Sequence, residues 1–178
     1  MLIVFAAATR LFPHYPNFTA MGAMAIFGGS VIKDKKLAFV LPLVALLLSD
    51  IVLQLTGITQ GFYGGQLFVY AAFVIITGLA TFIRKPGVTN IMFASVWAGL
   101  IFFVVSNLGV WLVGHGHMYP KTMAGLAACF ANAIPFYKSE FFGNFLLNGI
   151  YGNIFFSALM FGAYYLVIKA QKAKQAIA

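Results

Sequence analysis

The sequence predicts an all-α membrane protein, a bundle of six transmembrane helices that forms one domain over residues 1–178. Apolar residues make up 62% of the chain and charged residues only 8%, whereas about 25% of the residues in soluble domains are charged. The apolar residues form long blocks with short polar connections. Since about 20 apolar residues cross a bilayer as a helix, these blocks are the candidate spans.

Two short apolar runs predict the first two spans, at about residues 1–12 and 18–32. Pro13 and Pro16 lie between the runs, and because proline cannot continue a helix, we expect a turn there. The first run is too short to cross alone. We expect it to be completed by preceding residues or to lie partly in the membrane interface.

Four longer blocks predict spans at about residues 37–55, 62–83, 91–113 and 145–168. Between the last two, residues 122–134 are apolar, rich in small side chains and followed by Pro135. This stretch is too short to span, so it predicts a re-entrant or interfacial helix. It would serve either as a lid on the outer mouth of the bundle or as an amphipathic helix resting on the membrane surface.

The basic residues predict the orientation, because cytoplasmic loops retain Lys and Arg. With both termini in the cytoplasm, Arg10, Lys121 and Lys138 lie outside. The remaining flanking cations lie inside: Lys33, Lys35, Lys36, Arg84, Lys85, Lys169, Lys172 and Lys174. This asymmetry explains the net charge of +8 better than nucleic-acid binding does. It also places the long aromatic and Gly-rich loops outside, where we expect the functional site.

Polar residues within the spans are the first candidates for substrate binding. Asp50 in an apolar helix costs a few kcal/mol to insert, so it either binds a polar substrate or pairs with Arg10 or a lysine to stabilise the bundle. Asn107, Asn148 and Tyr151 either line a pocket open to the outside or join neighbouring helices. Asn144 precedes Asn148 and Tyr151 on the same predicted helix face.

The outer loops supply the other substrate-binding candidates: His14, Tyr15, Asn17, Tyr63, His115, Tyr119 and Lys121. Lys121 is expected to meet either an anionic group of a substrate or lipid phosphates. His115 and His117 are one residue apart, but two imidazoles without a nearby carboxylate or thiolate make a weak transition-metal site. Cys129 and His14 would complete such a site only if the loops converge, so no cofactor is firmly predicted.

Cys129 is the only cysteine and is expected to be a small buried residue or, in the sharper interpretation, a soft ligand to a cobalt-containing substrate. In the second predicted span, Gly22, Ala25 and Gly29 form a small-residue face that permits close approach of another helix. That helix belongs either to this chain or to a separate subunit.

The sequence contains no recognisable enzyme signature and no phosphate-binding loop. The chain has three acidic residues, too few for an evident proton relay. We therefore expect a binding or translocating component that is not an enzyme. The alternative is a non-transporting structural or assembly subunit of a larger membrane complex.

The runs "PHYPNFTAMGAMAIFGG", "LPLVALLLSD" and "SNLGVWL…GHMYPKTMAGLAACFANAIPF" resemble a family of small bacterial membrane proteins of transport type without assigned substrates. The resemblance extends from about residue 10 to residue 164. Its six-helix plan is similar to that of the substrate-binding S components of energy-coupling-factor (ECF) vitamin transporters. Those proteins bind a vitamin in an outward pocket roofed by loops, and they dock through small residues on a membrane partner driven by two ATPases.

The resemblance implies a multi-pass protein of the bacterial cytoplasmic (inner) membrane that takes up a small vitamin-type metabolite with the help of such a partner. Some solitary S-component-like proteins handle cobalamin, one of them through a cysteine that meets cobalt. Cys129 makes cobalamin the first guess for the ligand.

Overall fold

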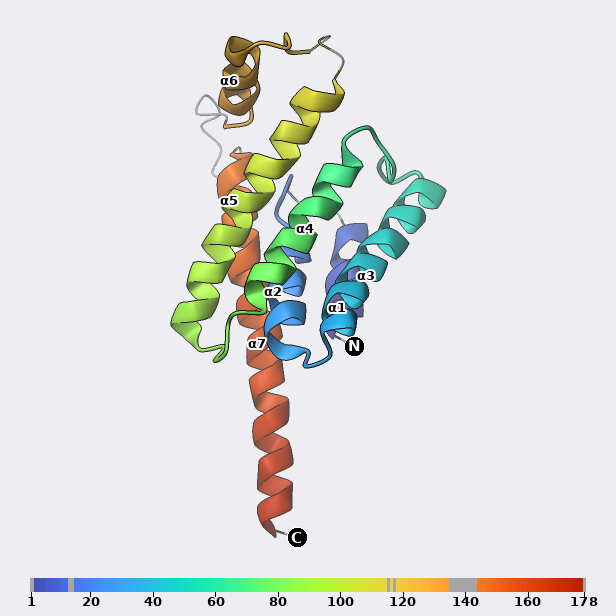
Figure 1. Cartoon of the computed structure of the whole chain (residues 1–178). Coiled ribbons are helices and arrows are strands. Elements are labelled where there is room, and N and C mark those ends of the chain that lie inside the picture. The colour runs from blue at the N-terminus through green and yellow to red at the C-terminus, as the bar shows by residue number, and fades with distance from the viewer. Residues whose placement is uncertain (1, 13–14, 115, 117, 135–143, 178) are drawn as a thin grey trace.

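The computed structural model describes residues 2–12, 15–114, 116, 118–134 and 144–177. Within these ranges the chain is helical and contains no strand, which confirms the predicted all-α class (Figure 1). The elements are α1 (Leu2–Ala8), the 3-10 turn η1 (Thr9–Leu11), α2 (Met21–Val31), α3 (Lys35–Thr56), α4 (Gln66–Ala80), α5 (Val88–Val113), α6 (Met123–Asn132) and α7 (Phe145–Ile177).

Three of the described helices, α3, α5 and α7, are long and apolar enough to cross a membrane. The other three predicted spans also form helices, α1, α2 and α4, but these are shorter than predicted. With 11 residues, α2 is only about 16 Å long at 1.5 Å per residue. The short helix α6 lies within the stretch predicted for the outer helix, residues 122–134.

Polar side chains determine where several helices begin. Asp34 precedes α3 and accepts a hydrogen bond from the backbone N–H of Leu37 at 3.1 Å. Thr122 caps α6 in the same way. The side chain of Asn144 accepts from the backbone N–H groups of Leu146 and Leu147, both at 3.0 Å. Asn144 is therefore the N-cap of α7. This role accounts for an asparagine at this position, and no contact with a ligand is needed to explain it.

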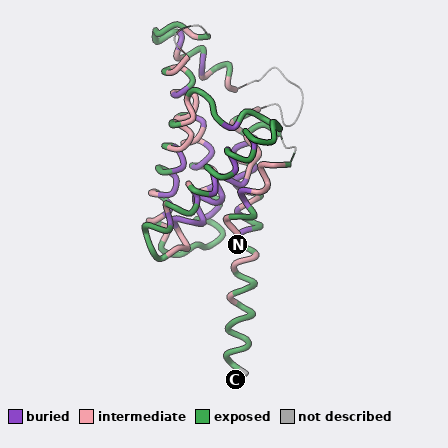
Figure 2. Tube along the Cα trace, turned by 90° about the vertical axis from the view of Figure 1, so that its right-hand side faces the viewer, coloured by how far each residue is buried: buried purple, intermediate pink, exposed green. Residues whose placement is uncertain are grey.

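Helix α2 lies at the centre of the bundle, where it contacts α1, α3, α4, α5 and α7. All residues from Met21 to Gly29 are buried (Figure 2). A Cβ atom on Gly22 would overlap the side-chain amide of Asn153 in α7, and one on Gly29 would overlap the carbonyl oxygen of Thr77 in α4. Ala25 is fully buried between these two positions. The helices that approach the small-residue face of α2 thus belong to this chain.

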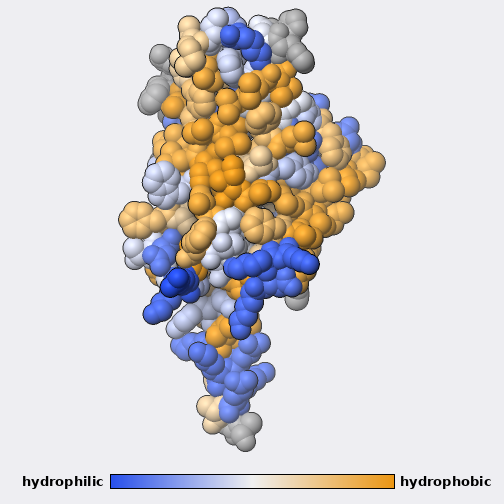
Figure 3. Space-filling view, viewed as in Figure 1, coloured by the Kyte–Doolittle hydropathy of each residue, from blue (hydrophilic) through white to orange (hydrophobic). Residues whose placement is uncertain are grey.

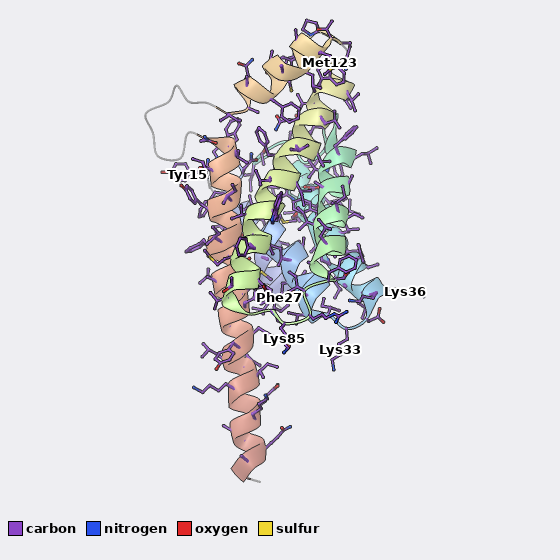
Figure 4. All side chains as sticks on the ribbon, turned by 60° about the vertical axis from the view of Figure 1, so that its left-hand side comes forward. Tyr15, Phe27, Lys33, Lys36, Lys85 and Met123 are labelled. Carbon is purple, nitrogen blue, oxygen red and sulfur yellow. The ribbon has the colours of Figure 1, made fainter. Side chains whose placement is uncertain are left out.

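The two ends of the bundle differ in charge. Lys33, Lys36 and Lys85 gather at the end from which the C-terminal part of α7 projects, while Met123 of α6 lies at the opposite end (Figure 4). Hydrophilic residues surround the first end and cover the projecting part of α7, and apolar residues cover the middle of this face (Figure 3). We call these the lysine end and the loop end. The orientation prediction depends on this separation of the lysine-rich turns from the long connections.

Candidate functional site

A cavity of about 260 Å³ lies in the loop-end half of the bundle, between α2, α3, α4, α5 and α7. Its inner walls are apolar and come from the helices, among them Met21, Leu46, Val69, Phe73 and Phe102. Asn153 of α7 is the one amide that a helix contributes to the described lining. A space whose inner walls are apolar and whose mouth carries several polar side chains has the character of a small-molecule site.

The rim of the cavity is polar and comes from connecting segments. Arg10 belongs to η1, and the connection from η1 to α2 contributes Asn17 and Thr19. The connection from α3 to α4 contributes Thr59, Gln60 and Tyr63. The rim therefore brings together two segments that are about 40 residues apart in sequence.

Glycines shape the space between the helices. Gly22, Gly99 and Gly149 all line the cavity. At Gly99 a Cβ atom would come within 2.6 Å of the Ile150 side chain, so this glycine permits α5 and α7 to approach. At Gly149 a Cβ atom would meet nothing within 4 Å. The missing side chain of Gly149 thus contributes directly to the free volume.

Asn148 fixes the segment at residues 15–20 to α7. It is fully buried, and its Nδ2 donates to the carbonyl oxygen of Pro16 at 2.9 Å. Asn17, whose φ of 63° is left-handed, donates from Nδ2 to the carbonyl oxygen of Phe145 at 3.3 Å. Asn148 was predicted to contact substrate, but it does not line the cavity; it holds in place the segment that does.

Asp50 is paired inside the protein and does not line the cavity. It is 2% exposed, and its Oδ1 lies 2.5 Å from Nη1 of Arg10. Its Oδ2 accepts hydrogen bonds from Gln66 Nε2 and from the Tyr70 hydroxyl, both at 2.7 Å. Arg10 also donates to the Ser49 hydroxyl at 2.5 Å. Of the two alternatives for Asp50, the structure shows the ion pair with Arg10.

The α3–α4 connection folds back onto the end of α3. Gln54 Oε1 accepts from the backbone N–H groups of Gly61 and Phe62 at 3.1 and 3.3 Å. Gly61 lies so close to the carbonyl oxygen of Asp50 that a Cβ atom would overlap it. This fold brings Tyr63 to the rim. The side chain as a whole is 47% exposed, but partial desolvation of its hydroxyl, with the Asp50 carboxylate adding to it, raises the pKa of the Tyr63 hydroxyl.

Residues 107–132 contribute nothing to the described lining of the cavity. Asn107 donates to the carbonyl oxygen of Phe103, one turn earlier in α5, at 2.7 Å. Cys129 is 2% exposed and its Sγ lies 3.5 Å from the carbonyl oxygen of Asn107. Helix α6 packs on α5, and Phe103 stacks edge-on against Phe130. Cys129 is thus a buried contact between α5 and α6, and α6 is not the roof of this cavity.

Lys121 caps the C-terminal end of α5. Its Nζ donates to the carbonyl oxygens of Trp111 and Leu112, the latter at 2.7 Å, and lies 5.1 Å from the centre of the Trp111 ring. A cation at this position is stabilised by the negative end of the helix. Tyr119 accepts from Asn132 at 3.5 Å. Both residues make hydrogen bonds that stabilise the α5–α6 connection, and neither lines the cavity.

Several predicted residues lie away from the cavity or outside the described residues. Tyr15 is 54% exposed and Tyr151 39% exposed, and Tyr15 lies at the edge of the bundle (Figure 4). His14, His115 and His117 lie outside the described residues. In the described ranges, no three His, Cys, Asp or Glu side chains come together as a metal site.

Of the substrate-binding predictions in the described ranges, only Asn17 and Tyr63 line the cavity. Sequence reasoning missed Thr19, Thr59, Gln60 and Asn153, and it treated Arg10 only as a partner for Asp50. A usable signal was available for some of them. Asn17, Thr19, Thr59, Gln60 and Tyr63 all lie in connections beside helix ends, where polar side chains can reach a pocket without being buried in lipid.

The chain belongs to a family of unknown function, DUF6580, whose model matches residues 1–176. Neither the curated proteins nor the solved structures contain a match.

Proposed function

We propose that this family member is a membrane protein that binds a small vitamin-type metabolite for uptake, on a plan similar to that of the ECF S components. The observation that carries the proposal is the cavity of about 260 Å³ with apolar walls and a polar rim. Such a site obtains affinity from apolar enclosure and selectivity from a few positioned polar groups.

The proposal includes six membrane passes, made by α1, α2, α3, α4, α5 and α7. Short helices are compatible with this plan when other helices shield their ends from lipid, because irregular backbone is tolerated at membrane depth only where protein covers it. Residues 18–20 are covered in part by the bundle, since Phe18 and Thr19 are half-buried. Gly152 of α7 approaches Phe18 and Thr19 so closely that a Cβ atom would lie 3.0 Å from the Thr19 nitrogen, and Ala20 is fully buried.

The cavity volume favours a smaller ligand than cobalamin. At about 260 Å³ the cavity lies just below the 300–1,000 Å³ of drug-sized ligand sites. A corrinoid with its nucleotide is much larger than such molecules, whereas a metabolite of one or two rings is of suitable size. Cys129 also lies outside the lining. We therefore propose a small organic metabolite in place of cobalamin.

Uptake would require a separate source of energy. The described residues include no phosphate-binding loop or paired carboxylates with which the chain could drive transport itself. A coupling subunit with ATPases is the partner that the S-component plan supplies. Because Gly22, Ala25 and Gly29 are covered by this chain's own helices, such a partner would dock elsewhere on the surface.

The proposal is tested by filling the cavity at Gly149. The wild-type protein is purified in mild detergent, its bound small molecules are identified by mass spectrometry, and the Gly149→Met variant is compared with it. We expect a bound metabolite in the wild type and an affinity lower by at least about 10-fold in the variant, since the side chain would occupy the binding volume. The fold should survive, because methionine is a better helix former than glycine by up to about 1 kcal/mol.

The matched control is Gly162→Met on the same helix, where a Cβ atom also meets nothing within 4 Å and no contact with the cavity exists. It should bind the metabolite like the wild type. A wild-type protein with no bound metabolite but with a stoichiometric protein partner would support the alternative of an assembly subunit. Equal binding by the Gly149→Met variant would show that the ligand lies elsewhere.

A further inference from the structure

We infer that the metabolite carries a carboxylate or a comparable anionic group, and that Arg10 binds this group at the rim of the cavity. The inference rests on the proposed function, because it names the chemical class of the ligand for the same site. It starts from the unequal positions of the two charged residues of the buried pair. Arg10 lines the cavity, whereas Asp50 does not.

The carboxylate of the pair does not line the cavity, and its oxygens are already satisfied. Both carboxylate oxygens of Asp50 accept hydrogen bonds, Oδ1 from Arg10 and Oδ2 from Gln66 and Tyr70. A ligand that approaches through the cavity therefore does not meet this carboxylate. It meets Arg10, which does line the cavity.

Arg10 retains donors for a ligand. Its bonds to Ser49 and Asp50 both use Nη1, while a guanidinium has five N–H donors on three nitrogens in a planar fork. With two of its nitrogens outside those bonds, Arg10 matches an acceptor with two oxygens, and arginine binds carboxylates in this way in many proteins. Asp50 and Ser49 hold the guanidinium in position, so little side-chain entropy remains to be lost on binding.

The other groups at the rim fit the same charge. The described lining of the cavity contains no acidic side chain, and its remaining polar residues can all donate hydrogen bonds: Asn17, Thr19, Thr59, Gln60, Tyr63 and Asn153. The first turn of α2 contributes Met21 and Gly22, and a helix N-terminus carries partial positive charge. The last turn of α3, where a helix carries partial negative charge, also reaches the cavity at Leu53. The carbonyl oxygen of Leu53 is already occupied, because it accepts a hydrogen bond from the backbone N–H of Gly57.

The experiment combines the identity of the bound metabolite with a matched set of probes. Mass spectrometry of the wild-type protein gives the charge of the metabolite directly. In parallel, thermal shift is measured with acids and with their neutral partners of nearly equal size: nicotinate and nicotinamide, biotin and biotinamide, pantothenate and panthenol. We expect an anionic metabolite and, in at least one pair, binding of the acid about 10- to 100-fold tighter than that of the neutral partner, the range for a charge-assisted hydrogen bond.

Arg10 is then tested by substitution. Because the Arg10→Gln variant would leave Asp50 buried without its cation, we use it together with the double variant Arg10→Gln/Asp50→Asn, which removes both charges and keeps amide groups at both positions. We expect the double variant to fold and to bind acid and neutral partner equally. The control Arg84→Gln, at an exposed arginine outside the lining, should retain the preference for the acid.

Three results would contradict the inference, and they have two different consequences. A neutral or cationic metabolite, or a folded double variant that still prefers the acid, would overturn the role of Arg10 and leave the proposed function in place. A wild-type protein that holds no metabolite would overturn the proposed function, and this inference with it.

Discussion

Asp50 illustrates how an apolar bundle accommodates a carboxylate. The side chain is 2% exposed, and burial of an unpaired ion costs several kcal/mol. Here the cost is offset by one cation and by two neutral donors, Gln66 and Tyr70, from the first turns of α4. The carboxylate therefore joins η1, α3 and α4 at the loop end of the bundle.

Removal of this carboxylate should be strongly destabilising. In the Asp50→Ala variant Arg10 keeps its charge in a largely buried position, with a side-chain exposure of 19%. We expect a loss of about 3–5 kcal/mol in the free energy of unfolding, the usual cost of breaking one side of a buried pair. Thermal unfolding in detergent measures the effect. The control is Asp34→Ala, which removes an exposed helix cap and should cost only about 1 kcal/mol; equal losses in the two variants would contradict the role of the pair.

Among the elements, α2 is the one for which the structure decides between two alternatives that the sequence left open. A short apolar helix crowded with small residues was compatible with a docking face for another subunit, yet the structure surrounds it with five helices of the same chain. The reason is steric. Glycine and alanine bring α4 and α7 close enough to α2 to bury residues 21–29, and nothing in the local sequence distinguishes an internal partner from an external one.

A larger residue in the middle of this contact should disrupt the bundle. We expect Gly29→Val to lower stability by at least about 1–3 kcal/mol, the usual cost of overpacking, because the new Cβ atom would overlap the carbonyl oxygen of Thr77 in α4. Backbone cannot move aside as a side-chain tip can. The folded fraction after purification, measured by size-exclusion chromatography, and the melting temperature both report the effect. Gly162→Val, at an open position, is the control, and an unchanged Gly29→Val protein would show that α2 and α4 are not in this contact.

At the scale of the whole molecule, the loop end holds both the cavity and the connections that form its rim, and the lysine end holds the short charged turns. The proposed uptake requires the loop end to face outward. Cys129 is the only cysteine, so a Cys129→Ala background permits single cysteines to be placed at either end.

The Thr59→Cys variant in this background should react with a membrane-impermeant maleimide in intact cells, because Thr59 is exposed at the rim. The Lys33→Cys variant, at an exposed position of the lysine end, should react only after the membrane is permeabilised. This follows from the retention of Lys and Arg in the cytoplasm. The reverse pattern would place the cavity on the cytoplasmic side and exclude uptake from outside through it.

The sequence by itself determined where the helices lie and which connections are polar. Hydropathy and helix-ending prolines act over a few residues, so the approximate bounds of α3, α5 and α6 followed from local patterns. The alternative of an Asp50–Arg10 pair also followed, since a buried carboxylate requires a partner.

Only the tertiary structure decided which polar residues line the cavity. In a membrane bundle both the lipid-facing and the core-facing residues are apolar, so the sequence does not show which face of a helix points inward. Asn148 and Asn153 lie on the same helix, yet Asn148 binds the carbonyl oxygen of Pro16 and Asn153 reaches the cavity. Their roles depend on how α7 packs against α2 and on the path of residues 15–20, and both are set by contacts between segments more than 100 residues apart.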